Sequence, residues 1–377
     1  MLGLLGDQLV AYPVVFGGAC VFSPSWCCLS STGYNTGGVF CYFPCSGWGT
    51  SFSSCADSHI TVGDGEAIAK EFSVNLGATD GISMQGDIAG DTFMSKVSAY
   101  LELTKPRVNS LVVLTSAIGF CLASSGDLNL LRLVHLLVGT LLLGGGTAVL
   151  NQFLERESDG KMHRTRNRPL PSGRLSAFQA IIFGSVLIVV GTLYLGIATH
   201  PLAALLGCST AAIYLLIYTP LKTRTTICTT VGAIPGALPP LIGWAAASGE
   251  LNFHALLLFA ILFSWQYPHF LAISWIYKED YLRGGVVMLP LFDPDGKRTT
   301  RHIVISSIIL LILSIIPATA GLSGEIYLVG AILLGVMFLG FGVGAAFSRS
   351  TSSARHVLRA SVVYLPLLLI LMIVDKV

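Results

Sequence analysis

Charged residues are scarce in this chain. They make up 11% of its 377 residues, whereas hydrophobic residues make up 53%. An ordinary soluble domain carries about 25% charged residues, and its helices need a polar face toward water. The scarcity therefore excludes an ordinary soluble enzyme and predicts a chain that lies mostly in lipid. The net charge of +2 is also too small to indicate a nucleic-acid partner.

Basic residues are absent from residues 1–69. A mitochondrial transit peptide would carry arginine, and a secretory signal would begin with a basic stretch, so neither is expected. Six cysteines lie in this segment, but no His or acidic residue accompanies them at metal-ligand spacing, and an inward-facing segment would stay reduced. We expect residues 1–95 to be a poorly ordered or non-native extension, and residues 96–377 to form the functional domain.

Long apolar runs fill the chain from about Val108 onward. Each run is close to the ~20 residues that a helix needs to cross a bilayer. The sequence therefore predicts an all-α membrane protein with nine transmembrane helices. The expected helices cover residues 108–125, 130–150, 177–198, 201–219, 228–247, 254–275, 302–321, 326–347 and 356–375.

The basic residues between these runs are unevenly distributed. They precede the first expected helix and follow the second, fourth, sixth and eighth, whereas the opposite side has only Arg132 and Lys376. Lys and Arg near helix ends are retained on the cytoplasmic side. The distribution predicts a cytoplasmic N-terminus and an external C-terminus.

Polar side chains emerge at the end of the second expected helix. If the helix continues, Asn151, Glu155 and Asp159 occupy positions i, i+4 and i+8 and share one face. Oxygen ligands of this kind suit Mg²⁺, which is usually held by one or two carboxylates together with substrate phosphates. We expect these three residues to hold Mg²⁺. Glu157 falls between the face positions and is expected to be the solvated partner of a nearby arginine.

A basic stretch follows this face directly. Guanidinium groups bind phosphate oxygens in a bidentate manner, so carboxylates followed by arginines indicate a metal-bound diphosphate. A solvated loop whose arginines only enforce topology is the alternative, but it leaves the Asn-Glu-Asp face unexplained, because polar groups on a membrane helix are costly. The segment 167–173 is expected to stop the helix in a turn. The expected diphosphate ligands here are Lys161, Arg164, Arg166 and Arg168.

A second chemical segment closes the sixth expected helix and leaves the membrane on the same side. Pro268 and His269 lie inside this helix, where the histidine is either a packed residue at a kink or a substrate contact. Just beyond, Asp280 could add a carboxylate to the metal site. The further candidate phosphate donors are Lys222, Lys278 and Arg283. Small residues and prolines over 232–240 favour a cavity for a long, lipid-like substrate.

These residues resemble the UbiA-type intramembrane prenyltransferases, whose first signature is Asn-x3-Asp-x3-Asp followed by a basic stretch. More closely, they resemble the protoheme IX farnesyltransferase branch of that family, known as the heme O synthases. The resemblance covers all but the first ~95 residues. Its motifs are Asn151 to Glu155, Arg164 to Leu170, Pro239 to Trp244, Pro268-His269-Phe270, Asp280-Tyr281 and Met288-Leu289-Pro290.

The resemblance implies a nine-helix bundle around a central cavity, and the transfer of a farnesyl group from farnesyl diphosphate to a vinyl group of heme B, giving heme O. It implies Mg²⁺ held by the Asn-Glu-Asp face, with Asp280 as a further catalytic residue. It also implies contacts with heme A synthase or terminal oxidase assembly. The absence of arginine from the N-terminal segment favours a bacterial plasma membrane over a mitochondrial membrane. The implied acceptor-pocket residues are Tyr267, His269 and Tyr281.

The sequence departs from the family pattern at two places. Glu155 stands where the broader signature has Asp, and the second segment offers Asp280 alone instead of paired aspartates. A prenyltransferase for a quinone or chlorophyll precursor is the alternative enzyme. A transporter is disfavoured, because the ionisable residues gather at one membrane face and no repeat of interrupted helices is evident.

Overall fold

In the computed structural model of the chain, residues 85–124 and 126–377 are described. Within these ranges nine helices are long and apolar enough to cross a membrane, which confirms the predicted number. The predicted extension, residues 1–95, lies outside the described residues except for its last part, where α2 (Gln85–Leu103) begins. Residue 96 therefore lies inside this helix.

The membrane-spanning helices agree closely with the apolar runs, because the length and apolarity of each run already satisfy the bilayer. Their bounds are α3 (Pro106–Ala123), α4 (Leu130–Lys161), α5 (Ala177–Ala198), α6 (Pro201–Ala212) continued by η1 (Ile213–Tyr218) and α7 (Thr219–Leu221), α8 (Cys228–Ala237) followed by α9 (Pro239–Ser248), α10 (Phe253–Ile276), α12 (Lys297–Thr319), α13 (Glu325–Ser348) and α14 (Thr351–Val374). Two short elements, α11 (Lys278–Arg283) and η2 (Leu289–Phe292), lie between α10 and α12.

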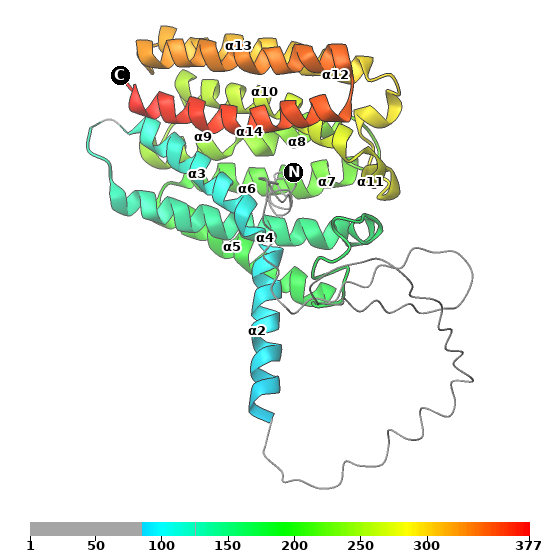
Figure 1. Cartoon of the computed structure of the whole chain (residues 1–377). Helices are drawn as coiled ribbons and strands as arrows, with labels where there is room; N and C mark the ends of the chain where they lie inside the picture. The colour runs from blue at the N-terminus through cyan, green and yellow to red at the C-terminus, as the bar shows by residue number, and fades with distance from the viewer. Residues whose placement is uncertain (1–84, 125) are drawn as a thin grey trace, which may run out of the picture. The chain divides into compact units, whose positions relative to one another are not determined.

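The helices pack side by side in a bundle (Figure 1). Along the chain α3 contacts α4, α4 contacts α5, and α5 contacts α6, while α12, α13 and α14 contact each other in turn. Helix α9 packs against α3 and α6, and α10 packs against α8, α12 and α14. Within the 18-residue apolar window of each span, buried residues make up 72% in α8–α9 and in α10, but only 22% in α5 and 28% in α13. The bundle therefore has α8–α10 inside and presents α5 and α13 to lipid.

Helix α4 is longer than its apolar run. It continues from Leu130 to Lys161, so the polar segment after residue 150 is helical. The helix ends before segment 167–173, which forms turns but does not itself stop the helix as the sequence suggested. Met162 caps this end by donating its backbone N–H to the Asp159 carbonyl. The extension carries the Asn-Glu-Asp face beyond the apolar part of the bundle.

Close backbone contacts join α3 and α9. A Cβ atom on Gly243 would meet the backbone carbonyl of Ser116, and a Cβ on Gly119 would meet the carbonyl of Pro240. The two helices can approach this closely only because neither position carries a side chain.

Replacing Gly243 with Ala is expected to push α3 and α9 apart and to lower the free energy of unfolding by about 2 kcal/mol. Thermal unfolding of the purified protein in detergent measures this change. Gly344→Ala is the matched control, because open space surrounds Gly344. Equal melting temperatures for the two variants would contradict the contact.

Candidate active site

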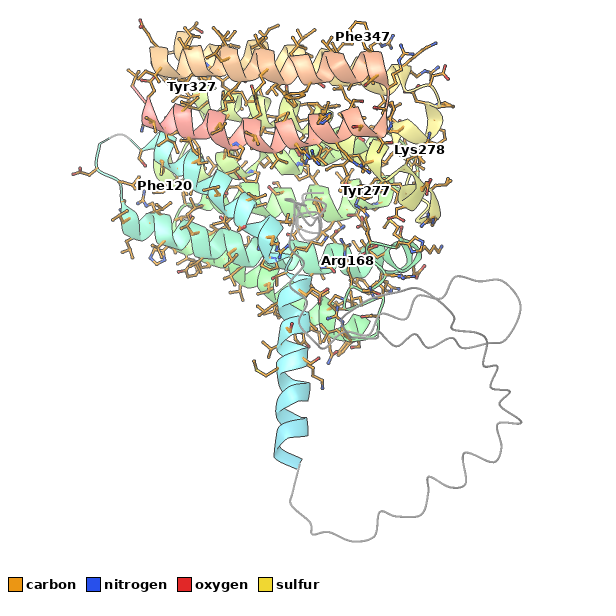
Figure 2. The ribbon with its side chains drawn as sticks, viewed as in Figure 1. Phe120, Arg168, Tyr277, Lys278, Tyr327 and Phe347 are labelled. Carbon is orange, nitrogen blue, oxygen red and sulfur yellow. The ribbon has the colours of Figure 1, made fainter. Side chains whose placement is uncertain are left out.

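The polar ends of several helices gather at one end of the bundle. Figure 2 shows Arg168, Tyr277 and Lys278 toward this end, whereas Phe120 and Tyr327 lie toward the other. A cavity of about 390 Å³ opens here. It is lined by the C-terminal part of α4, the η1–α7 segment, the loop after α4, and residues 281–288.

The three oxygen-bearing residues of α4 all line this polar cavity, each with a partner from elsewhere. Lys222 Nζ lies 2.7 Å from Glu155 Oε1, and Arg168 Nη1 lies 2.8 Å from Asp159 Oδ2. Both ion pairs are largely buried, with the side chains between 2% and 17% exposed. The carboxylates are therefore held close to cations that could serve a phosphate.

Asn151 is bound from two sides. Its Oδ1 accepts a hydrogen bond of 3.2 Å from Lys105 Nζ, and its Nδ2 donates one of 3.2 Å to Thr219 Oγ1. The Thr219 hydroxyl in turn donates to the carbonyl of Tyr214. The amide side chain thus connects the start of α3 to the η1–α7 segment across the cavity wall.

Arg164 lies between two aromatic rings. Its guanidinium carbon is 5.1 Å from the centroid of Tyr277 and 4.9 Å from that of Tyr281. Its buried Nε and Nη1 atoms have no hydrogen-bond partner among the described residues, although the residue lines the polar cavity. The two cation–π contacts hold the guanidinium group in place, and its unpaired donors are suited to an anion.

Two lysines of the cavity differ in their surroundings. Burial, reinforced by the Arg168 guanidinium, lowers the pKa of Lys105 from 10.5 to about 7. Burial alone would also lower the pKa of Lys222, but the Glu155 carboxylate raises it above its usual range. Lys222 is therefore firmly charged, while an anion entering the cavity would favour the charged form of Lys105.

A π-helical turn forms part of the wall of the polar cavity that faces α4. Over Ile213–Tyr218 the chain is π-helical, and the Thr219 N–H reaches back to the Tyr214 carbonyl. This turn presents the Tyr214 and Tyr218 rings, whose centroids are 5.1 Å apart, and Lys222 Nζ lies 4.8 Å from the Tyr218 ring. π-helical turns are rare and occur often at functional sites.

A second, mainly apolar cavity of about 120 Å³ lies between α3, α4, α6, α8 and α10. Glycine makes room for it, since a Cβ on Gly207 would lie 2.5 Å from Leu143 Cδ2, and one on Gly144 would meet Asn109 Oδ1. Lys105 and Tyr214 line both this cavity and the polar one. The two cavities therefore adjoin at these two residues.

The chain matches the model of the UbiA prenyltransferase family over residues 112–365. It is 51% identical over 286 residues to the protoheme IX farnesyltransferase of Solibacter usitatus, covering 74% of this chain and 98% of that protein. It is 43% identical over 287 residues to the enzyme of the same name in Koribacter versatilis, covering 74% of this chain and 93% of the relative. The chain belongs to the UbiA prenyltransferase family.

Solved structures agree on the fold. A digeranylgeranylglyceryl phosphate synthase is similar with a TM-score of 0.64 at 19% identity, over 74% of this chain and 98% of the other. A UbiA homologue from Archaeoglobus fulgidus, bound to GPP and Mg²⁺, is similar with a TM-score of 0.53 at 15% identity, over 73% of this chain and 99% of the other. The chain therefore has the fold of the intramembrane prenyltransferases.

Several predicted site residues of this prenyltransferase lie away from the polar cavity. Lys161 and Arg166 are exposed and do not line it. Asp280 accepts from Arg283 Nη1 at 3.2 Å and lines a separate surface pocket with Lys278 and Arg283. The structure therefore does not bring Asp280, Lys278 or Arg283 to the three oxygen-bearing residues of α4. Glu157 is exposed and pairs with Arg156 at 3.5 Å, as expected.

The predicted acceptor residues are divided between different places. Tyr281 lines the polar cavity beneath Arg164. His269 is fully buried beside α14, where its Nδ1 lies 2.8 Å from Ser361 Oγ and its ring stacks on Trp265. Tyr267 makes an edge contact with Phe263. Neither His269 nor Tyr267 lines either cavity, which favours the packed-kink interpretation of the histidine.

The cavity residues that were absent from the sequence prediction include Lys105, Tyr214 and Tyr218. Lys105 was counted only as a topological charge, although Lys-Pro at the start of the first apolar run lies on the same membrane side as the arginines. The tyrosines precede Lys222 by eight and four residues, which places them on its face of a helix. This four-residue spacing could have predicted that both tyrosines lie near Lys222.

Breaking the Glu155–Lys222 pair is expected to destabilise the protein. Lys222→Met leaves a largely buried carboxylate without its 2.7 Å partner, which costs about 3 kcal/mol. The double variant Glu155→Gln/Lys222→Met removes both charges and should recover most of the loss. Melting temperatures in detergent measure both effects.

Lys297→Met serves as the control, since its 3.7 Å pair with Asp295 is 65% and 72% exposed and contributes at most about 1 kcal/mol. A double variant as unstable as Lys222→Met would show that lost packing, and not the unpaired charge, causes the effect.

Proposed function

We propose that this chain transfers the farnesyl group of farnesyl diphosphate to a vinyl group of heme B, giving heme O. The observation that carries the proposal is the pair of adjoining cavities, one polar and one apolar. A prenyl diphosphate has a charged head and an apolar tail, so it matches this division. The names of the relatives, protoheme IX farnesyltransferases over nearly their full length, supply the acceptor.

The polar cavity has the charge that a diphosphate needs. Its lining includes the carboxylates of Glu155 and Asp159 and four basic side chains, which give an excess of two positive charges when Lys105 is protonated. Within it, Arg164 offers unpaired donors, while Arg168 and Lys222 are paired with the carboxylates. A bound diphosphate would draw these two cations toward its oxygens and release the carboxylates.

The released carboxylates fit Mg²⁺. Asn151, Glu155 and Asp159 would supply one amide and two carboxylate oxygens from one helix face, as Mg²⁺ sites completed by substrate phosphates do. No cluster of three or more His, Cys, Asp or Glu suited to a metal occurs in the part of the chain that the structure describes, so the phosphates would have to complete the site. When bound, the ion supplies positive charge to the diphosphate.

The residues of the chain then direct the reaction. Arg164, Arg168 and Lys222 bind the diphosphate and stabilise its charge as the allylic C–O bond breaks. The apolar cavity holds the farnesyl tail away from water. The vinyl carbon of heme B bonds to the allylic carbon, and water adds to the resulting cation with loss of a proton, leaving a hydroxyethylfarnesyl chain.

An opening toward lipid admits the acceptor. Leu154 and Leu216 line the polar cavity but are 48% and 73% exposed. Apolar side chains exposed on a membrane protein face lipid. Heme B could therefore reach the allylic carbon from the membrane. We place the cavity end at the cytoplasmic face of a bacterial plasma membrane, on the side where the basic residues gather, with heme A synthase or an oxidase assembly as the recipient of product.

Purified protein supplied with heme B, farnesyl diphosphate and Mg²⁺ is expected to form heme O, identified by the mass of the product. Asp159→Asn should lower the rate at least about 100-fold, because one metal ligand and the partner of Arg168 are lost together. Glu157→Gln, an exposed residue on the same helix, should keep full activity.

A quinone or chlorophyll precursor is the alternative acceptor. Prenylation of 4-hydroxybenzoate without any heme O would refute the heme assignment while preserving the diphosphate site. Loss of activity in both Asp159→Asn and Glu157→Gln would refute the assignment of the α4 face.

The apolar cavity gives a separate prediction. Gly207→Val should fill the space beside Leu143 and raise KM for farnesyl diphosphate about tenfold, by displacing the tail. Inhibition by inorganic diphosphate, which has no tail, should be unchanged. Weaker inhibition by inorganic diphosphate would show that the variant disturbs the polar cavity instead.

A further inference from the structure

Lys105 has no role in the mechanism above, although its position is unusual. It lines both the polar and the apolar cavity, and Tyr214 is the other residue to do so among the lining residues of the two cavities. A substrate with its head in one cavity and its tail in the other must cross between them at its C1–O bond. The two shared residues therefore lie beside the bond that breaks.

The backbone of Lys105 is in a conformation that its sequence disfavours. Its φ and ψ angles are 49° and 62°, in the left-handed region that few non-glycine residues adopt. The following residue is Pro106, which further disfavours compact conformations of the residue before it. Strained residues of this kind persist where the surrounding structure holds them, and they cluster at functional sites.

Backbone hydrogen bonds hold the turn between α2 and α3, where Lys105 lies. The Lys105 carbonyl accepts the backbone N–H groups of Val108 and Asn109, and the Lys105 N–H reaches the Glu102 carbonyl. The turn joins α2 to α3 and directs the side chain toward α4, where Nζ donates to Asn151 Oδ1 at 3.2 Å. The left-handed backbone at this junction therefore sets where the ammonium group of Lys105 lies.

The geometry points to Lys105 as a catalytic residue that donates a hydrogen bond to the bridging oxygen of the prenyl diphosphate, the oxygen that leaves C1. This inference rests on the proposed function. As the C1–O bond breaks, the electron pair stays on that oxygen, and a cation beside it stabilises the new charge. The effect is larger in the transition state than in the bound substrate, so it acts on kcat more than on KM.

The other cations of the cavity cannot take this position as readily. Arg168 and Lys222 lie beside Asp159 and Glu155, and neither they nor Arg164 line the apolar cavity. These three residues are placed to bind the outer oxygens of the diphosphate. Lys105 is thus the cation nearest to the tail, at the start of α3.

Replacing Lys105 with Met tests the inference. We expect kcat for heme O formation to fall about 100-fold, with KM for farnesyl diphosphate and the inhibition constant of inorganic diphosphate changed less than about threefold. Inorganic diphosphate has no bond to C1, so it reports binding of the outer oxygens. Arg107→Met, an exposed basic residue two positions further on that lines neither cavity, should match the wild type.

Lys105→Gly separates catalysis from folding. Glycine adopts the left-handed conformation without strain, so this variant should melt at or above the temperature of the wild type while losing about as much kcat as Lys105→Met. Two results would overturn the inference: a kcat of either variant close to that of the wild type, or a loss of inorganic diphosphate inhibition as large as the loss of kcat. Absence of heme O in the wild type would instead refute the proposed function.

Discussion

The pairing of charges at the end of α4 is the constraint on which the site depends. Glu155 and Asp159 leave the membrane on a helix face that enters a partly buried cavity, and an isolated carboxylate there would be costly. Lys222 from the end of α7 and Arg168 from the loop after α4 neutralise them at 2.7 and 2.8 Å. The same two ion pairs hold the end of α7 and the loop against α4. They therefore both shape the wall of the cavity and supply its charged groups.

The features that depend on local periodicity could be predicted from the sequence. Nine apolar runs correspond to nine membrane-length helices within residues 85–124 and 126–377, because each run had to satisfy its own backbone in lipid. The spacing of Asn151, Glu155 and Asp159 placed them on one face as soon as α4 proved to continue to Lys161. The same rule placed Glu157 on the solvated side, where it pairs with Arg156.

The features that depend on tertiary placement could not be predicted in this way. Asp280 shares a membrane side with α4, but α11 directs it to Arg283 and a separate pocket. The sequence around a histidine that follows a helix proline does not show whether its side chain faces a substrate or a neighbouring helix. In the structure, His269 lies beside Ser361 of α14. Lys105 was counted only as a topological charge, because its contact with Asn151 depends on a left-handed backbone that a residue before proline rarely adopts.

The paired carboxylates also constrain the order of events under the proposed function. A metal ion arriving alone would have to displace Lys222 and Arg168 from Glu155 and Asp159, leaving two cations without partners in a cavity that already has excess positive charge. A diphosphate arriving alone would gain those cations but leave the two carboxylates unpaired. Each ligand removes the penalty that the other incurs, so their binding is coupled in both directions. The protein therefore favours the metal–diphosphate complex over either component, and its internal ion pairs keep the site folded between turnovers.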